Sequence, residues 1–148
     1  MWTHKYSIRL SLACTWLFMI LLAAGLALAP RAAWAYILWN HKAPTLLPVL
    51  LSAFYFCAGP AAILLWKLRS LLTAIGAGQV FTAGNVAALR IISWCCFAAA
   101  LVCLCYSWAY LPFFFIAVAA AFVGLILRVV KNVFEQAVEL KEENDYTI

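Results

Sequence analysis

The chain has 148 residues, of which 69% are hydrophobic and only 10% are charged, and its formal net charge at pH 7 is +5. A soluble domain carries about 25% charged residues, and one of this size could not bury so much apolar surface in its own core, so the composition excludes an ordinary soluble protein. The positive charge is not arranged as a basic stripe with interleaved aromatic residues, which speaks against direct binding of nucleic acid.

Four apolar windows are long enough to cross a hydrocarbon core of about 30 Å, which takes about 20 helical residues. They cover residues 10–29, 46–66, 91–110 and 113–130. None contains an acidic residue, and Arg128 near the end of the fourth is the only basic one. The sequence therefore predicts an all-α integral membrane protein, a four-helix bundle in contact with membrane lipid, which forms a single domain over residues 1–148.

The first window resembles a secretory signal, because Lys5 and Arg9 precede it and small residues occupy its end. Its apolar run is longer than the usual 7 to 15 residues or so, and Pro30 would directly follow the cut, so we expect a retained helix. Residues 30–44 then place apolar side chains at helical spacing. They predict a short helix that lies at the outer membrane surface.

The second window contains Gly59 and Pro60 in its interior. Proline removes one backbone hydrogen bond and crowds the carbonyl four residues earlier, so a kink is expected there. Such a kink can open a cavity between helices, or it can serve helix packing alone. The sequence leaves both interpretations open.

A polar stretch, GQVFTAGNVAALR at residues 78–90, separates the second and third windows. Gly78 is placed to end an extension of the second helix, and Thr82 is placed to cap the start of the third. Asn85 lies three residues after Thr82, where a capping-box side chain reaches back to the backbone N–H of the cap.

Two more side chains of this stretch have expected roles. Phe81 is expected to fill the space beneath the apolar faces of the neighbouring helices. Arg90 is expected to mark the inner lipid boundary or to meet the acidic tail. Taken together, the stretch predicts the junction of the cytoplasmic face, with direct contact to a partner as the alternative.

The fourth window continues as an amphipathic cytoplasmic helix and tail over residues 131–148. A helix unbroken from Phe113 to Glu143 would be roughly 46 Å long, which exceeds the bilayer core by several turns. Its expected apolar face comprises Val130, Val133, Phe134, Ala137 and Val138, and its expected polar face comprises Arg128, Lys131, Asn132, Glu135, Gln136, Glu139 and Glu142. Lys67, Arg69 or Arg90 is expected to face Glu139, Glu142 and Glu143.

Orientation follows from the basic residues, since Lys and Arg near helix ends are retained on the cytoplasmic side. With four spans, Arg31 and Lys42 lie on one side and the other eight of the ten Lys and Arg residues lie on the opposite side. Both termini are therefore expected in the cytoplasm, with the second and fourth helices extended into it.

The sequence offers little catalytic chemistry. The six cysteines include no CxxC pair, and all five acidic residues follow Val133. We therefore expect no enzymatic activity, no bound metal and no cofactor, and we interpret the cysteines as small buried hydrophobic residues. Small residues spaced by four, among them Ala117 with Ala121 and Ala120 with Gly124, predict close helix packing within one chain or between two copies of a homo-oligomer.

The polar stretch and the tail FEQAVELKEENDYTI resemble the bacterial membrane family known as domain of unknown function 2975. The specific matches are Gly78, Phe81, Asn85, Leu89, Arg90, Leu140, Glu142, Asn144, Asp145, Thr147 and Ile148. The resemblance implies a four-span protein of the bacterial inner membrane with no assigned enzymatic activity. Members are often encoded beside small helix-turn-helix regulators, which implies, by association, pairing with a transcription factor.

Three functions are compatible with these observations. The first is a non-enzymatic regulatory or accessory protein that binds a soluble cytoplasmic partner, such as a helix-turn-helix regulator. The second is a transport or immunity protein that holds a lipid or an amphipathic peptide near the kink at Gly59 and Pro60. The third is a structural subunit of a membrane complex. Candidate structural or partner-contact residues are Gly78, Phe81, Thr82, Asn85, Arg90, Glu139, Glu142, Asn144 and Asp145.

Overall fold

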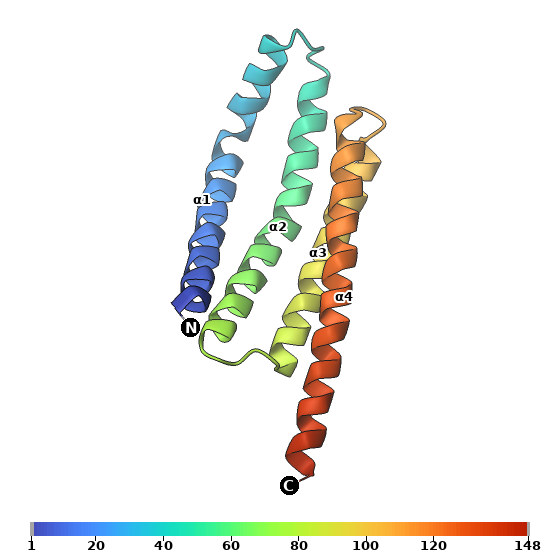
Figure 1. Cartoon of the computed structure of the whole chain (residues 1–148). Helices are drawn as coiled ribbons and strands as arrows, with labels where there is room; N and C mark the ends of the chain where they lie inside the picture. The colour runs from blue at the N-terminus through green and yellow to red at the C-terminus, as the bar shows by residue number, and fades with distance from the viewer. Residues whose placement is uncertain (1, 148) are drawn as a thin grey trace.

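The computed structural model describes residues 2–147, with side chains from residue 3 onward. The terminal residues of the expected domain, Met1 and Ile148, lie outside this range. The described chain folds into four α-helices and no strand: α1 (Trp2–Trp39), α2 (Leu46–Gly76), α3 (Ala83–Tyr106) and α4 (Pro112–Tyr146) (Figure 1). Each helix is long and apolar enough to cross a membrane. The protein is therefore an all-helical protein of the multi-pass membrane type.

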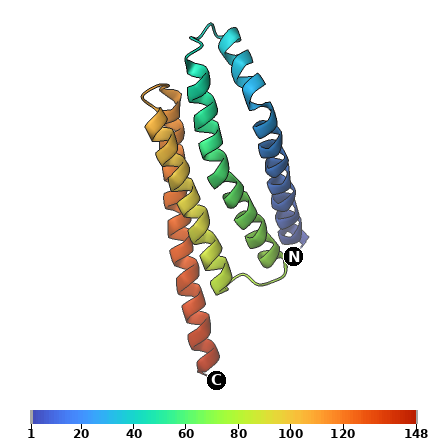
Figure 2. The ribbon, with the colours of Figure 1, turned by 180° about the vertical axis from the view of Figure 1, so that it is seen from behind.

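The helices contact one another only in chain order. Within residues 2–147, α1 contacts α2, α2 contacts α3, and α3 contacts α4, and no other pair of helices comes together. In Figures 1 and 2, α2 lies between α1 and the pair formed by α3 and α4, which overlap in these views. The row is open, which corrects the expectation of a compact four-helix bundle. Lipid covers an apolar helix face as well as a second helix does, so a membrane imposes no need to close the bundle.

The first helix runs through Pro30 without a break and ends at Trp39. The short surface helix expected after residue 30 is therefore the continuation of α1. A proline is tolerated inside a membrane helix when a neighbouring group satisfies the carbonyl that the proline leaves without a partner. Here the hydroxyl of Tyr55 on α2 donates to the carbonyl of Leu26, four residues before Pro30, over 3.1 Å.

The third helix ends at Tyr106, four residues before the end of the expected window. A turn follows, in which the hydroxyl of Ser107 donates to the carbonyl of Leu104 and the backbone N–H of Tyr110 donates to the carbonyl of Tyr106. Pro112 then starts α4, in the first turn of which a missing N–H costs nothing. Leu111, the residue before Pro112, already has helical backbone angles (φ −52°, ψ −37°), so the chain enters α4 directly from this turn.

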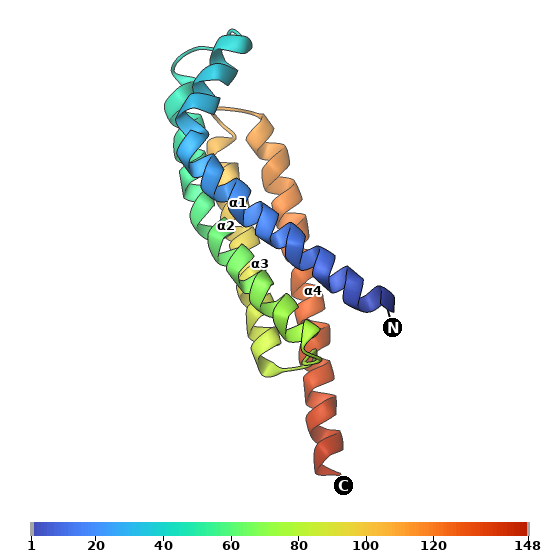
Figure 3. The same cartoon turned by 90° about the vertical axis from the view of Figure 1, so that its left-hand side faces the viewer.

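The fourth helix is unbroken and longer than expected. Its 35 residues span roughly 52 Å at about 1.5 Å per residue. Figures 1 and 3 show that its C-terminal end projects well beyond the other three helices. The last turns of α4 therefore have no neighbouring helix to pack against.

A hydrophobic cluster lies at the end of the row from which α4 projects. Its buried members come from α2 and α3, and partly buried side chains of α2 and α4 pack against it. The buried members are Leu71, Ala88, Leu89 and Ile92, and the surrounding ones are Leu64, Leu68, Ile75, Leu127, Val130 and Phe134. This cluster supports the turn between α2 and α3.

Candidate functional site

Gly78 ends α2 through backbone geometry that a side chain would disturb. Its φ is +86°, in the left-handed region that favours glycine. Its N–H donates to the carbonyl of Ile75, and the N–H of Gln79 donates to that of Ala74, both over 3.0 Å. This is the Schellman arrangement, which satisfies the last carbonyls of a helix and turns the chain sharply.

Thr82 is the N-cap of α3, as the sequence predicts. Its backbone is extended, and its hydroxyl oxygen accepts a hydrogen bond of 3.2 Å from the N–H of Asn85. The Asn85 side chain, however, does not form a capping box. It is 4% exposed, and its amide donates to the carbonyls of Gln79 and Val80, both over 2.7 Å. The expectation for Asn85 is corrected because its two N–H groups find carbonyls of the preceding turn, which folds back over α3.

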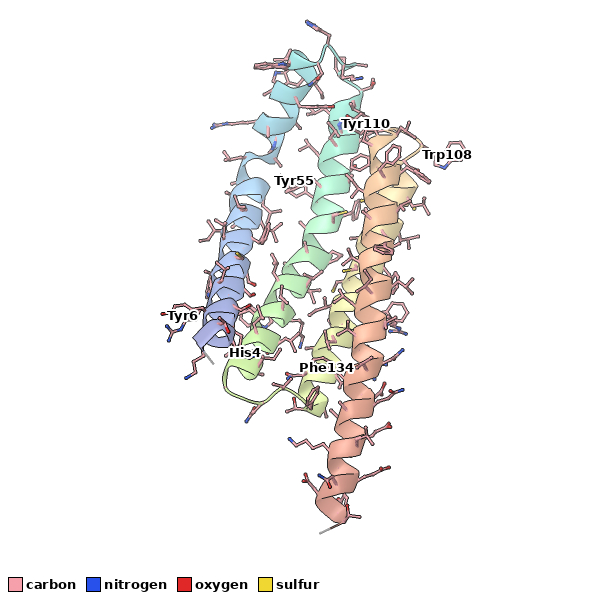
Figure 4. All side chains as sticks on the ribbon, viewed as in Figure 1. His4, Tyr6, Tyr55, Trp108, Tyr110 and Phe134 are labelled. Carbon is pink, nitrogen blue, oxygen red and sulfur yellow. The ribbon has the colours of Figure 1, made fainter. Side chains whose placement is uncertain are left out.

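Phe81 fastens this turn to α4. Its ring packs edge-on against Phe134, with 5.4 Å between the ring centroids. Figure 4 shows Phe134 on the side of α4 that faces the other helices. We call the α2–α3 junction the turn at residues 77–82, the first turns of α3, and residues 131–138 of α4 that face them. Phe81 is 43% exposed, so it contacts α4 from the edge of this junction, and its filling of space beneath the apolar faces stays a prediction.

A cluster of charged side chains lies at the junction, where α4 packs against α3. The three buried residues of α4 are Ala117, Gly124 and Lys131, which are spaced by seven. The Lys131 ammonium lies 3.0 Å from one carboxylate oxygen of Glu135 and donates to the side-chain oxygen of Asn132. Arg90 of α3 approaches the other oxygen of Glu135 at 3.7 Å.

The cluster corrects two expectations about α4. Lys131, expected on the polar face, has a side chain only 11% exposed, whereas Val133, expected on the apolar face, is 57% exposed. The contact with α3 follows a repeat of seven residues, the period of helices that pack side by side, rather than the local amphipathic pattern. The spacing of seven between Ala117 and Gly124, continued by one step, predicts that Lys131 also faces α3. Its partner Glu135 follows at the i,i+4 spacing of helical ion pairs.

The electrostatic environment favours the ionised form of Glu135. The hydrogen bond and the charge of Lys131, with a smaller contribution from Arg90, lower the pKa of Glu135 below its ordinary value. The carboxylate is about half exposed, so solvent screens the pair and its contribution to stability is modest.

The tail candidates lie outside the junction. Glu139, Glu142, Asn144 and Asp145 are all exposed, and none takes part in an ion pair within the described part of the chain. Arg90 thus contacts Glu135 in place of the three glutamates expected from the sequence. The reason is geometric: α3 begins at Ala83, so residue 139 of α4 already lies beyond the end of α3.

Tryptophan rings contact two other arginines, which the sequence predicts at the cytoplasmic side of the membrane. The guanidinium of Arg69 lies 4.8 Å from the ring centre of Trp16 on α1 and 5.8 Å from that of Trp66. Arg128 lies 5.1 Å from the ring centre of Trp94. Trp and Arg gather where a membrane meets water, so these pairs are typical of an interfacial belt.

The small-residue face of α4 is used inside the chain. Ala117 and Gly124 are buried, and a Cβ added at Gly124 would come within 3.1–3.2 Å of Phe97 and Cys96 on α3. The sequence left open whether this face joins helices of one chain or of two. In the structure, Ala117 and Gly124 of this face pack between α3 and α4 of one chain.

Two apolar cavities lie between α1 and α2, and the lining of the second includes Ala61, directly after the proline of α2. One of about 430 Å³ extends from Gly25 to Tyr36 and is roofed by the contact between the hydroxyls of Tyr36 and Tyr110. The other, of about 390 Å³, shares Gly25 and Phe54 with the first. Neither is lined by Gly59 or Pro60, and a Cβ at Gly59 would meet no atom within 4 Å.

The cysteines make one close pair. The sulfur atoms of Cys57 on α2 and Cys103 on α3 lie 3.8 Å apart. Nowhere among residues 2–147 do three His, Cys, Asp or Glu side chains gather as a metal site would need. The pair therefore marks close packing of α2 on α3.

Comparison with protein families identifies the family of the chain. A family model described as protein of unknown function, DUF2975, matches residues 12–148. The chain belongs to the DUF2975 family. The match covers both the α2–α3 junction and the tail, where the sequence resemblance was concentrated. No curated protein and no solved structure matches the chain. Membership of this family carries no assigned activity, so function has to be argued from the geometry.

Proposed function

We propose that this DUF2975 protein is a non-enzymatic regulatory or accessory membrane protein whose projecting helix end binds a soluble partner with a basic surface. We call residues 139–147 the acidic tail. Every residue of the acidic tail is exposed, although it is helical to Tyr146. This observation carries the proposal, because a regular helix that packs on nothing in its own chain is available for another molecule.

The charge of the acidic tail favours a basic protein over the membrane surface. Four of the five acidic residues of the chain lie in it, beside the single lysine Lys141, whereas the other nine Lys and Arg residues lie elsewhere. Anionic lipid attracts basic segments and repels acidic ones. The membrane surface therefore holds the basic helix ends and keeps the acidic tail in solution.

The acidic tail is already helical before a partner binds. An isolated helix as short as residues 139–146 is marginal in water, but this one continues a long helix that the α2–α3 junction holds in place. A partner thus meets a helix already formed, which reduces the entropy lost on binding. Leu140, 66% exposed, lies seven residues after Val133, 57% exposed, so the two share the helix face that helix-in-groove recognition uses.

The side of the membrane follows from the basic residues. Eight of ten Lys and Arg residues on the side of the acidic tail favour a cytoplasmic location in a bacterial inner membrane. A helix-turn-helix regulator, which the family resemblance implies, would present a basic surface of the required kind, since DNA-binding domains are strongly basic. Binding to the acidic tail would then compete with binding to DNA.

Copurification from native membranes tests the proposal. The comparison uses the full chain, a chain that ends at Val138, and a chain in which Glu139, Glu142, Glu143 and Asp145 are changed to Lys. We expect one or more soluble basic proteins with the full chain and their loss from both variants. Glu135→Gln, which alters the junction but not the acidic tail, is the matched control and should retain the partner. An identical set of copurifying proteins for all four chains would contradict the proposal.

A further inference from the structure

The attachment of α1 to the rest of the protein leaves a crevice at its N-terminal end. Among the helices, α1 contacts only α2 within the described residues, and Tyr36 near its other end contacts Tyr110 in the turn before α4. Between the first turns of α1 and the last turn of α2 lies a cavity of about 390 Å³. It is lined by Lys5, Ile8, Arg9, Leu12, Thr73 and Gly76. Basic and apolar side chains thus line one site at the end of a membrane-spanning pair.

The two cations of this crevice have no counter-ion among residues 2–147. Lys5 and Arg9 are one helical turn apart and exposed, and neither belongs to an ion pair of the described structure. Every acidic residue of the chain lies at Glu135 or beyond, on α4, which α1 does not contact. The charge complementary to Lys5 and Arg9 must therefore come from another molecule.

The groups of α2 in the crevice do not take the place of that anion. The C-terminal end of a helix carries about half a negative elementary charge, which is less than the two positive charges that face it. The hydroxyl of Thr73 donates to the carbonyl of Arg69 over 2.8 Å, so it is engaged within α2. A net positive charge remains for a bound anion.

The apolar walls specify which kind of anion fits. Ile8 is half-buried beside Gly76, and Leu12 follows one turn along α1, in the direction of the membrane core. A free phosphate would leave this apolar surface in contact with water. A phospholipid would cover it with the start of an acyl chain and place its phosphate between the cations.

We propose that the crevice binds an anionic glycerophospholipid, with the headgroup phosphate between Lys5 and Arg9 and an acyl chain along Ile8 and Leu12. The lipid bridges α1 and α2 at the end of the row where α1 has no other support. Basic pockets between membrane helices bind anionic headgroups in this way. The site is independent of the acidic tail, and its test does not depend on the partner proposed above.

Lipid titration of the purified full chain, followed by native mass spectrometry, tests the site. The probes are phosphatidylglycerol and phosphatidylcholine with the same palmitoyl and oleoyl chains. We expect phosphatidylglycerol to bind about tenfold more tightly, and the double variant Lys5→Gln/Arg9→Gln to lose about 10- to 30-fold in phosphatidylglycerol affinity. Because both residues are exposed and unpaired, the variant should unfold at the wild-type temperature.

The matched control is Arg31→Gln/Lys42→Gln, which removes the same charge at the opposite end of α1. It should bind phosphatidylglycerol like the wild type, and millimolar inorganic phosphate should not displace the lipid. Equal loss of affinity in both double variants would show that only total charge matters and would overturn the site. Unchanged binding in Lys5→Gln/Arg9→Gln, or displacement by inorganic phosphate, would overturn it as well.

Discussion

The hydroxyl of Tyr55 on α2 donates a hydrogen bond of 3.1 Å to the carbonyl of Leu26 on α1. In an unbroken helix this carbonyl would accept from the N–H of residue 30, which is a proline and has none. Inside a membrane no water replaces the missing donor. Tyr55 therefore both satisfies the carbonyl that Pro30 leaves without a donor and links α1 to α2.

This pairing predicts a coupling between two substitutions. Tyr55→Phe should destabilise the protein by about 1–2 kcal/mol, because the Leu26 carbonyl loses its donor. Pro30→Ala restores a backbone N–H to that carbonyl, so Tyr55→Phe should cost clearly less in the Pro30→Ala background. A double-mutant cycle of unfolding in detergent measures the coupling. Tyr106→Phe, whose hydroxyl makes no hydrogen bond in the described structure, is the control; additive costs would contradict the pairing.

A second prediction concerns Asn85, whose buried amide holds the turn before α3. Asn85→Ala removes two hydrogen bonds of 2.7 Å and should destabilise the protein by about 1–3 kcal/mol. Asn85→Asp should cost more, since a carboxylate cannot donate and would face two carbonyls. Thermal unfolding of both variants checks this order. Gln136→Ala, at an exposed position of α4, should change little, and equal stability of all three variants would rule out the role assigned to Asn85.

A third prediction concerns pH. Because the pKa of Glu135 is lowered in the folded state, its contribution to stability is present above the unfolded pKa of about 4.3 and is lost as pH falls through the folded value. Glu135→Gln should therefore be less stable than the wild type near pH 7, with the difference shrinking below about pH 4. Melting temperatures from pH 3 to 7 measure the trend. Glu139→Gln, one turn further along α4, removes a carboxylate that joins no ion pair of the described structure and is the matched control.

A fourth prediction separates two glycines that both lie inside helices. Glycine costs a helix up to about 1 kcal/mol relative to alanine, so Gly59→Ala, which meets nothing within 4 Å, should be neutral or stabilising. Gly124→Ala places a methyl group 3.1–3.2 Å from Phe97 and Cys96, and should be about 1–2 kcal/mol less stable than Gly59→Ala. Unfolding measurements on the two variants test this difference in stability. If Gly124→Ala instead changed only the oligomeric state, the face would serve a second chain.

Local chemistry at the helix ends could be predicted from the sequence. Gly78 and Thr82 act through their own backbone and their nearest neighbours, so a short stretch of residues is enough to assign them. The four apolar segments are equally local, since hydrophobic length alone decides whether a helix can cross a membrane.

Long-range relationships could not be predicted in the same way. The partners of Asn85 depend on how the turn folds back, and the donor for Leu26 comes from another helix 29 residues away. The burial of Lys131 depends on which face of α4 meets α3, and the amphipathic pattern of the last turns indicated a different one. The open row itself has no signature in any one segment, because an apolar face looks the same whether lipid or a helix covers it.

The central claim, that the acidic tail contacts a soluble partner, is tested most directly by photo-crosslinking in living cells. A photoreactive amino acid is placed at Leu140 in the acidic tail and, for comparison, at Val118 on the exposed membrane-spanning surface of α4. We predict a discrete adduct with a soluble protein at position 140 alone, which disappears when Glu139, Glu142, Glu143 and Asp145 are changed to Lys. No adduct at position 140, or one that survives the charge reversal, would contradict the account.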